Sequence, residues 1–158
     1  VSTDIIVGFP GETEVDFAAT LEVAAAAEDD FAFTFIFSPR PGTEAATMTD
    51  RFVDAGIAAE RFERLKIVVE RSALARHRGR IGRTEELLIE GPSRKDPGVM
   101  TGRTGQNKLV HFPSPTPLRA GSYASVEIVS AAPHHLGGRL IEVLSDARHK
   151  IRIPIAVG

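Results

Sequence analysis

The chain has 158 residues, of which 42% are hydrophobic and 25% are charged, and its formal net charge at pH 7 is -2. These values are ordinary for a soluble globular protein of one domain or two small ones. The absence of cysteine excludes disulfides, a catalytic thiol and any thiolate-held zinc or iron–sulfur site built from these residues alone. No stretch has the length and apolarity of a membrane span, and the N-terminus has no signal-peptide pattern, so we expect a cytoplasmic protein without membrane contact.

The first 28 residues predict a strand, a turn and a helix. Residues 3–7 have strand character and run into a Gly-Phe-Pro-Gly turn. Thr13 followed by Asp16 resembles a capping box, which predicts a helix up to about residue 28. Its apolar stripe comprises Phe17, Leu21, Ala24 and Ala25. Because Val1 already stands at the edge of the strand and is not an initiator methionine, we expect a fragment whose partner strands lie upstream.

Residues 31–37 (FAFTFIF) form a near-continuous apolar run that predicts a strand covered on both faces. Strand, helix and strand at this spacing make a βαβ unit, whose right-handed crossover places the two strands parallel in one sheet. Two conspicuous turns, at residues 8–12 and 38–42, follow the carboxyl ends of these strands. Since α/β folds bind ligands at such ends, both turns are candidate ligand sites.

The rest of the chain predicts a second helix and then a small β-barrel. Residues 43–56 look irregular, and a helix is predicted over residues 58–78, with apolar positions at Phe62, Leu65 and Val69 and glycines after its end. The domain boundary is placed after residue 82. Five short strands are predicted beyond it, at residues 86–90, 99–103, 108–112, 122–131 and 139–144. They indicate a small closed barrel resembling an OB-fold over residues 83–144, followed by a tail over residues 145–158.

Residues 90–112 are a candidate nucleic-acid-binding face. They place Arg94, Lys95, Arg103 and Lys108 between short strands, with Asp96 as an opposing charge. Such cations neutralise phosphates, and neighbouring polar side chains can donate hydrogen bonds to nucleic acid. Residues 83–158 carry 10 Lys and Arg against 7 Asp and Glu, whereas residues 1–82 carry 9 against 14. A solvated hairpin with ordinary surface charge explains the four basic residues equally well.

The remaining motifs give weaker signals. The turn over residues 8–13 has glycines that let a ligand approach the backbone, and Glu12 can accept a hydrogen bond from an amine or hydroxyl. It matches neither the P-loop nor the three-glycine dinucleotide pattern, and a purely structural turn is the more common case. The five histidines show no metal-ligand spacing, and adjacent His134 and His135 are interpreted as surface residues. No serine has the context of a nucleophile elbow.

Three segments together resemble one enzyme family. Residues 3–13 (TDIIVGFPGET) resemble a late-strand motif of the radical S-adenosylmethionine methylthiotransferases, and residues 33–43 (FTFIFSPRPGT) are similar to the next strand of the branch that modifies tRNA. Residues 90–96 (EGPSRKD), with 101–104 (TGRT), Asn107 and 110–112 (VHF), resemble the TRAM domain of the same family. The three matches follow the order of the family and span most of residues 1–144.

The resemblance implies the C-terminal part of a MiaB-type tRNA methylthiotransferase, which adds a methylthio group at carbon 2 of an isopentenylated adenosine beside the anticodon. The fold implied is the last strands and helices of a radical-SAM partial (β/α) barrel over residues 1–82, followed by the TRAM barrel. The cofactors implied are S-adenosylmethionine and two [4Fe–4S] clusters, and the partner is the tRNA anticodon stem-loop, bound by a monomer. The cysteines that hold the clusters in this family are absent here, so the fragment alone is expected to be inactive.

The resemblance also assigns roles to individual residues. The cofactor turn comprises Gly8, Pro10, Gly11 and Glu12, and the RNA contacts comprise Arg94, Lys95, Arg103, Asn107, Lys108 and His111. Arg40 either faces the catalytic cavity or forms a salt bridge with a barrel helix. Two other readings remain open: a sister enzyme acting on threonylcarbamoyladenosine or on a ribosomal-protein aspartate, and a non-catalytic RNA-binding module. The turn at residues 38–43 and the Arg94-Lys95-Asp96 stretch favour the isopentenyladenosine branch.

Overall fold

The computed structural model describes residues 2–27 and 31–147, which form two compact units divided between Arg76 and His77. The division falls near the end of a long helix, six residues before the boundary that the sequence suggested. Within the described residues, no helix combines the length and apolarity needed to cross a membrane. Asp29, Asp30 and most of the predicted tail over residues 145–158 lie outside the described part of the chain.

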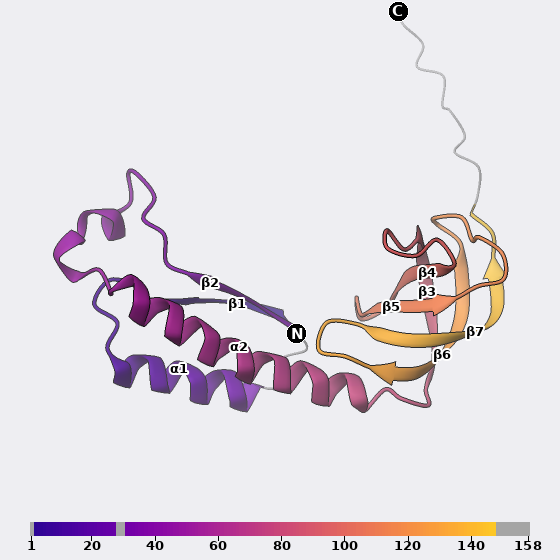
Figure 1. The fold of residues 1–158 in the computed structure, drawn as a ribbon, viewed down its shortest axis with the longest axis horizontal. Helices are drawn as coiled ribbons and strands as arrows, with labels where there is room; N and C mark the ends of the chain where they lie inside the picture. The colour runs from indigo at the N-terminus through magenta and orange to yellow at the C-terminus, as the bar shows by residue number, and fades with distance from the viewer. Residues whose placement is uncertain (1, 28–30, 148–158) are drawn as a thin grey trace, which may run out of the picture. The chain divides into compact units, whose positions relative to one another are not determined.

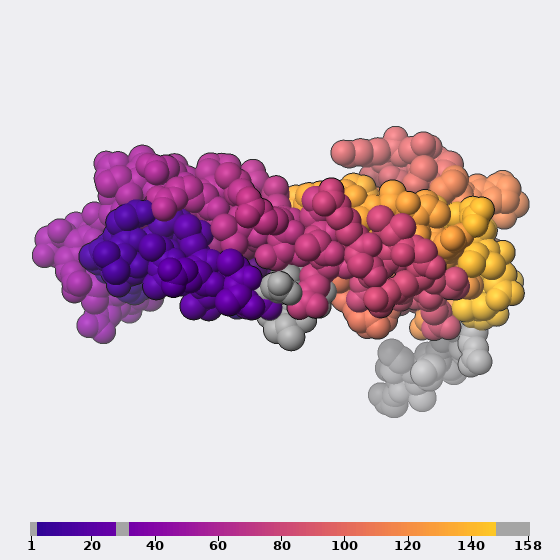
Figure 2. Space-filling model, turned by 90° about the horizontal axis from the view of Figure 1, so that it is seen from below, coloured from indigo at the N-terminus to yellow at the C-terminus, as the bar shows by residue number. Residues whose placement is uncertain are grey.

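The first unit is built on two parallel strands, as the βαβ pattern predicted. Strand β1 (Ser2–Val7) leads to helix α1 (Glu14–Ala27), strand β2 (Phe31–Ile36) and helix α2 (Ala55–Arg78). The stretch expected to be irregular contains two short 3₁₀ helices, η1 (Glu44–Thr47) and η2 (Thr49–Arg51). Figures 1 and 2 show α1 and α2 lying against each other, and Figure 1 shows both on the same side of the two-stranded sheet.

The core of the first unit lies between the helices and one face of the sheet. Its buried members are Val7, Phe17, Ala24 and Leu65, with Ile5, Leu21, Phe62, Val68 and Val69 packed around them. The other face is open, since Ile6 and Phe33 each expose 52% of their surface and Phe35 exposes 47%. The prediction that β2 is covered on both faces is therefore wrong within this chain, because both helices pack on one side. Ala25, predicted to lie in the apolar stripe of α1, is exposed.

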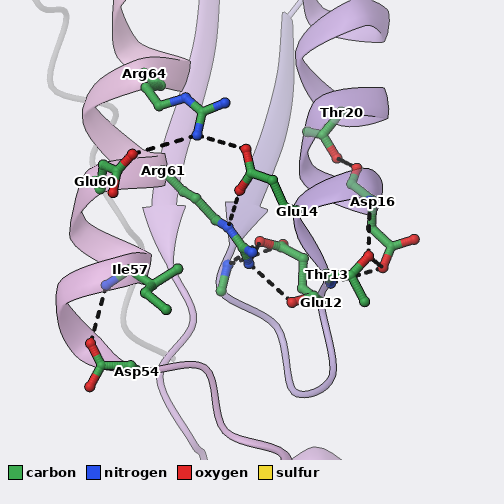
Figure 3. Close-up of polar contacts among 11 residues, drawn as sticks. Glu12, Thr13, Glu14, Asp16, Thr20, Asp54, Ile57, Glu60, Arg61 and Arg64 are labelled. Carbon is green, nitrogen blue, oxygen red and sulfur yellow. Dashed lines mark hydrogen bonds and ion pairs between the residues drawn. The ribbon is translucent and has the colours of Figure 1, made fainter.

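Helix α1 begins with the capping box that the sequence indicated (Figure 3). The Thr13 hydroxyl accepts a hydrogen bond from the Asp16 amide at 3.2 Å, and the Asp16 carboxylate accepts one from the Thr13 amide at 2.9 Å. The same carboxylate accepts a bond from the Thr13 hydroxyl at 2.7 Å. The two bonds that the Asp16 carboxylate accepts lower the pKa of Asp16 from its ordinary value of 3.8. The bond from the Thr13 hydroxyl has the larger effect, and the bond from the Thr13 amide the smaller one.

Replacement of Thr13 by Ala is expected to raise the pKa of Asp16 toward 3.8, as measured by NMR titration of its carboxyl carbon. In the native chain the lowered pKa stabilises the fold at pH values above 3.8, and this contribution disappears as the pH falls through the lower folded-state pKa. The matched control is Thr20→Ala, because the Thr20 hydroxyl donates to the Asp16 carbonyl oxygen and not to its carboxylate. An equal pKa rise in both variants would contradict the assignment.

The second unit is a closed five-stranded barrel, as the pattern of short strands predicted. Its strands are β3 (Thr84–Pro92), β4 (Val99–Thr104), β5 (Leu109–Pro113), β6 (Tyr123–Ala131) and β7 (Leu136–Ser145), in the barrel order β3-β4-β5-β7-β6. Side chains alternate between the interior and the outer surface along β3, β4 and β5. The interior holds Leu87, Ile89, Met100, Val110, Phe112, Ala124, Val126, Ile128 and Leu136.

A short parallel pairing closes the barrel. Val110 and His111 of β5 pair with Leu136 and Gly137 of β7, while all the other strand pairs of the barrel are antiparallel. Strand β7 begins three residues earlier than predicted, and those residues make the pairing. As a result, the connection between β6 and β7 lies next to β5, which determines which side chains can meet on the outer surface.

Candidate nucleic-acid interface

The connection between β3 and β4 presents two adjacent cations. Arg94 and Lys95 are exposed, and neither makes an ion pair with any described residue. The connection is held by its own backbone and short side chains: the Lys95 amide donates to the Ser93 hydroxyl at 3.3 Å, and the Ser93 amide donates to the Val99 carbonyl at 2.7 Å. Two uncompensated charges on an ordered turn are suited to contact phosphate groups.

Next to them, the outer surface of β4 and β5 carries a hydrogen-bonded histidine. His111 lies opposite Thr101 in the β4–β5 pairing, and its Nδ1 is 3.2 Å from the Thr101 hydroxyl. The ring of His135, from the β6–β7 connection, packs edge to face against that of His111 with centroids 5.2 Å apart. Partial burial lowers the pKa of His111, and the nearby charges of His135 and Lys95 lower it further.

Arg103 lies on the same outer surface but already has partners. Its Nε donates to the Glu90 carboxylate at 2.8 Å, and one Nη donates to the side-chain oxygen of Asn107 at 3.2 Å. Asn107 adopts a left-handed conformation, with φ of 62°, at the β4–β5 turn. Both side chains can still reach a ligand. The positive charge of Arg103 is nevertheless partly neutralised by Glu90, unlike the charges of Arg94 and Lys95.

Lys108 does not fit the predicted role. It is only 5% exposed, because it shares the inward-facing side of the chain with Val110 and Phe112, and we drop it from the candidate phosphate contacts. The positive charge of the second part of the chain also disappears when only its described residues are counted. Between residues 83 and 147, seven Lys and Arg balance seven Asp and Glu. The net excess of residues 83–158 comes from Arg148, Lys150 and Arg152, which lie outside the described residues. Whether the barrel has a basic face therefore depends on where the individual cations lie on its surface.

Sequence reasoning missed His135 as a member of this surface. It was interpreted as a surface residue without a role, and it is indeed exposed, but its ring contacts His111. No local motif gives this contact, because it depends on the parallel pairing of β5 with β7. Thr101, in the segment 101–104 that resembles the TRAM domain, is the hydrogen-bond partner of His111.

The turn from Gly8 to Glu12 directs its polar groups toward its own chain (Figure 3). The Glu12 carboxylate accepts bonds from the Gly8 amide at 3.1 Å and from Arg61 of α2 at 2.7 Å. The Gly11 amide donates to the Arg51 carbonyl at 2.8 Å. A Cβ on Gly8 would lie 2.9 Å from the Cβ of Ala58, so contact with α2 already explains this glycine. Pro10 is buried in the same turn.

For the cofactors that the sequence resemblance implied, this chain supplies no cluster-binding cysteine, and its Glu12 carboxylate is already hydrogen-bonded within the chain. The carboxylate expected to accept a hydrogen bond from a ligand is engaged by Arg61 and Gly8, and no thiolate is available to an iron–sulfur cluster because the sequence has no cysteine. Among the described residues, no group of three or more His, Asp or Glu is placed to hold a metal ion. The cofactor role of Gly8, Pro10, Gly11 and Glu12 stays a prediction. So does the role of Arg40, which is exposed in the loop after β2.

Comparison with known proteins agrees with this architecture. The model of the TRAM domain matches residues 78–141. The tRNA-2-methylthio-N(6)-dimethylallyladenosine synthase of Burkholderia thailandensis is 43% identical over 150 residues, covering 93% of this chain and 33% of the relative. The proteins of the same name from Burkholderia ambifaria and Burkholderia mallei are 42% and 41% identical over the same coverage. The chain thus spans about one third of the length of the curated relatives it matches. Over 93% of its length the chain is thus similar to proteins named tRNA-2-methylthio-N(6)-dimethylallyladenosine synthase, and its barrel matches the TRAM domain.

Proposed function

We propose that the barrel binds tRNA at the anticodon stem-loop through the β3–β4 connection and the outer surface of β4 and β5. The observation that carries this proposal is the pair of exposed cations, Arg94 and Lys95, which have no ion-pair partner among the described residues. The charge of Lys95 is close enough to His111 to lower its pKa. Arg103 and Asn107 would extend the contact along β4 and the β4–β5 turn. The TRAM match and the tRNA-modifying relatives support RNA as the polyanion.

Salt dependence tests this interface. The double variant Arg94→Gln/Lys95→Gln is expected to weaken binding to a fluorescein-labelled anticodon stem-loop RNA. It should also reduce the slope of log affinity against log salt by about 2, one for each lost phosphate contact. Fluorescence anisotropy at several salt concentrations measures both quantities. The single change Arg103→Ala should reduce the slope by about 1 or less, because Glu90 already neutralises part of the charge of Arg103.

The matched control is Arg139→Gln. Arg139 is an exposed arginine on the same barrel, its side chain is 72% exposed, and it is paired with Glu127. This variant should leave the salt slope unchanged. A slope that falls equally in the control and in the double variant would show that only the overall charge matters, and it would contradict the assigned interface.

We further propose that the chain is the C-terminal portion of an enzyme that inserts a methylthio group at carbon 2 of an isopentenylated adenosine by radical S-adenosylmethionine chemistry. The name shared by the relatives supports this branch over the sister enzymes. The two clusters of such an enzyme would need cysteines from outside this sequence. In the first unit, Arg61 and Glu12 would then hold the Gly8–Glu12 turn in shape at the carboxyl end of β1.

Two experiments test the enzymatic proposal. Reading the coding region upstream of Val1 should reveal an open frame with a Cys-x-x-x-Cys-x-x-Cys triplet. A nearby start codon without cysteines would instead leave RNA binding as the supportable activity. The complete enzyme should also bind anticodon stem-loops that carry the isopentenyl group more tightly than those without it, and indifference to that group would contradict the assigned branch.

A further inference from the structure

The histidine pair on the barrel surface is surrounded by groups that disfavour positive charge. His111 is hydrogen-bonded to Thr101 of β4, pairs with Gly137 of β7 and packs against His135 of the β6–β7 connection. The charge of Lys95 in the β3–β4 connection also acts on it. Among the described residues, the charged groups that act on its pKa are His135 and Lys95, and no carboxylate is one of them. Two imidazoles and an ammonium group therefore stand together without a neutralising partner.

Protonation of His111 costs no hydrogen bond at this position. The partner of its Nδ1 is the Thr101 hydroxyl, which can either donate or accept. His135 is exposed at its side, with the ring centroids 5.2 Å apart and the planes 66° from each other. The obstacles to a positive charge are thus partial burial and the neighbouring positive groups. A bound polyanion removes the second obstacle.

We propose that His111, His135 and Lys95 form a proton-linked RNA-binding site, in which a phosphate bound beside Lys95 and the exposed ring of His135 is accompanied by protonation of His111. The proton comes from the buffer and ends on an imidazole nitrogen. The phosphodiester stays ionised throughout and no bond to it is formed. This inference rests on the proposed RNA binding and adds His135, a residue to which no role was assigned, together with a pH dependence.

The sign of the effect follows from linkage. RNA that favours protonated His111 raises the pKa of His111 in the complex above its pKa in the free protein, so binding takes up a proton and affinity increases as the pH falls between these two values. A pKa one unit higher in the complex corresponds to an increase in affinity of up to about tenfold for each coupled group. Above the higher pKa and below the lower one, affinity should not vary with pH through this site.

The test uses the 158-residue chain and a fluorescein-labelled anticodon stem-loop RNA, titrated at constant ionic strength from about pH 5.5 to about pH 8.5. Affinity of the native protein is expected to rise by roughly three- to tenfold toward the acidic end. His111→Gln, which keeps a polar side chain but cannot take up the proton, should lose most of this rise, and His135→Gln, which removes the ring packed against His111, should reduce it. The control His134→Gln changes the exposed neighbour in the same connection and should keep it.

A second readout separates titration from a structural role. NMR titration of the imidazole resonances should show a higher pKa for His111 in the RNA complex than in the free protein. RNA binding that is salt-dependent but equally strong at all these pH values, or equal pH profiles for the native protein and His111→Gln, would overturn the inference and leave the proposed RNA binding intact. Absence of RNA binding at every pH would overturn both.

Discussion

Replacement of Arg61 by Met is expected to destabilise the first unit by about 3–5 kcal/mol, the usual cost of removing one partner from a buried ion pair. The side chains of Arg61 and Glu12 expose only 6% and 10% of their surface, and their atoms are 2.7 Å apart. Arg61 also donates to the Glu12 carbonyl at 3.1 Å and lies over the ring of Phe17 at 5.6 Å. Methionine keeps the apolar length but leaves the carboxylate without its cation.

A control variant and a double variant test whether the loss of stability comes from the buried ion pair. Lys66→Met removes an exposed cation of the same helix, whose ion pair with Glu63 spans 3.6 Å, and it should cost less than about 0.5 kcal/mol. The double variant Arg61→Met/Glu12→Gln should cost less than the sum of its single changes, because no unpaired charge remains. Urea unfolding followed by far-ultraviolet circular dichroism measures these effects, since both α-helices of the described residues lie before residue 79. Equal costs for Arg61→Met and Lys66→Met would contradict the role of the buried pair.

Much of the fold could be predicted because side-chain periodicity and turn residues are local signals. The short segments between turn residues that predicted the barrel strands show alternating buried and exposed positions in β3, β4 and β5. The predicted ends of helices and strands were wrong where a residue type is compatible with more than one kind of structure. Helix α2 begins before the predicted Ala58 because the Asp54 carboxylate accepts bonds from the Gly56 and Ile57 amides, although Gly56 argued against a helix there. Gly137 and Gly138 stand before the strand predicted at residues 139–144, yet they lie inside β7.

Of the candidate site, only those features that depend on residues close together in the sequence could be predicted. Arg94 and Lys95 could be identified because charged residues in a Pro- and Gly-rich connection are normally exposed. The burial of Lys108 could also have been foreseen, since it stands two and four residues before the inward-facing Val110 and Phe112. The contact between His111 and His135 could not, because the two residues meet through the β5–β7 pairing, which depends on closure of the whole barrel.

Replacement of Gly138 by Ala is expected to destabilise the barrel by at least ~2 kcal/mol, because the added methyl group has no space. A Cβ on Gly138 would lie 2.3 Å from Cγ1 of Val126 and 3.2 Å from Cγ1 of Val110, and both valines are fully buried. Valine side chains in strands have few alternative rotamers, so neither neighbour can move aside at low cost. The matched control is Gly105→Ala, since a Cβ at that position would meet no atom within 4 Å.

Unfolding of the barrel can be followed separately from that of the helices. Tyr123 of β6 is the single tyrosine of a chain without tryptophan, so intrinsic fluorescence reports on the barrel. The double variant Gly138→Ala/Val126→Ala removes the atom that the new methyl group would strike, and it should cost less than the sum of the two single changes. Equal stability of Gly138→Ala and Gly105→Ala would contradict the packing argument. Since Gly137, the neighbour of Gly138, pairs with His111, a shift of β7 at this point should also weaken the pH dependence of RNA binding before the barrel unfolds.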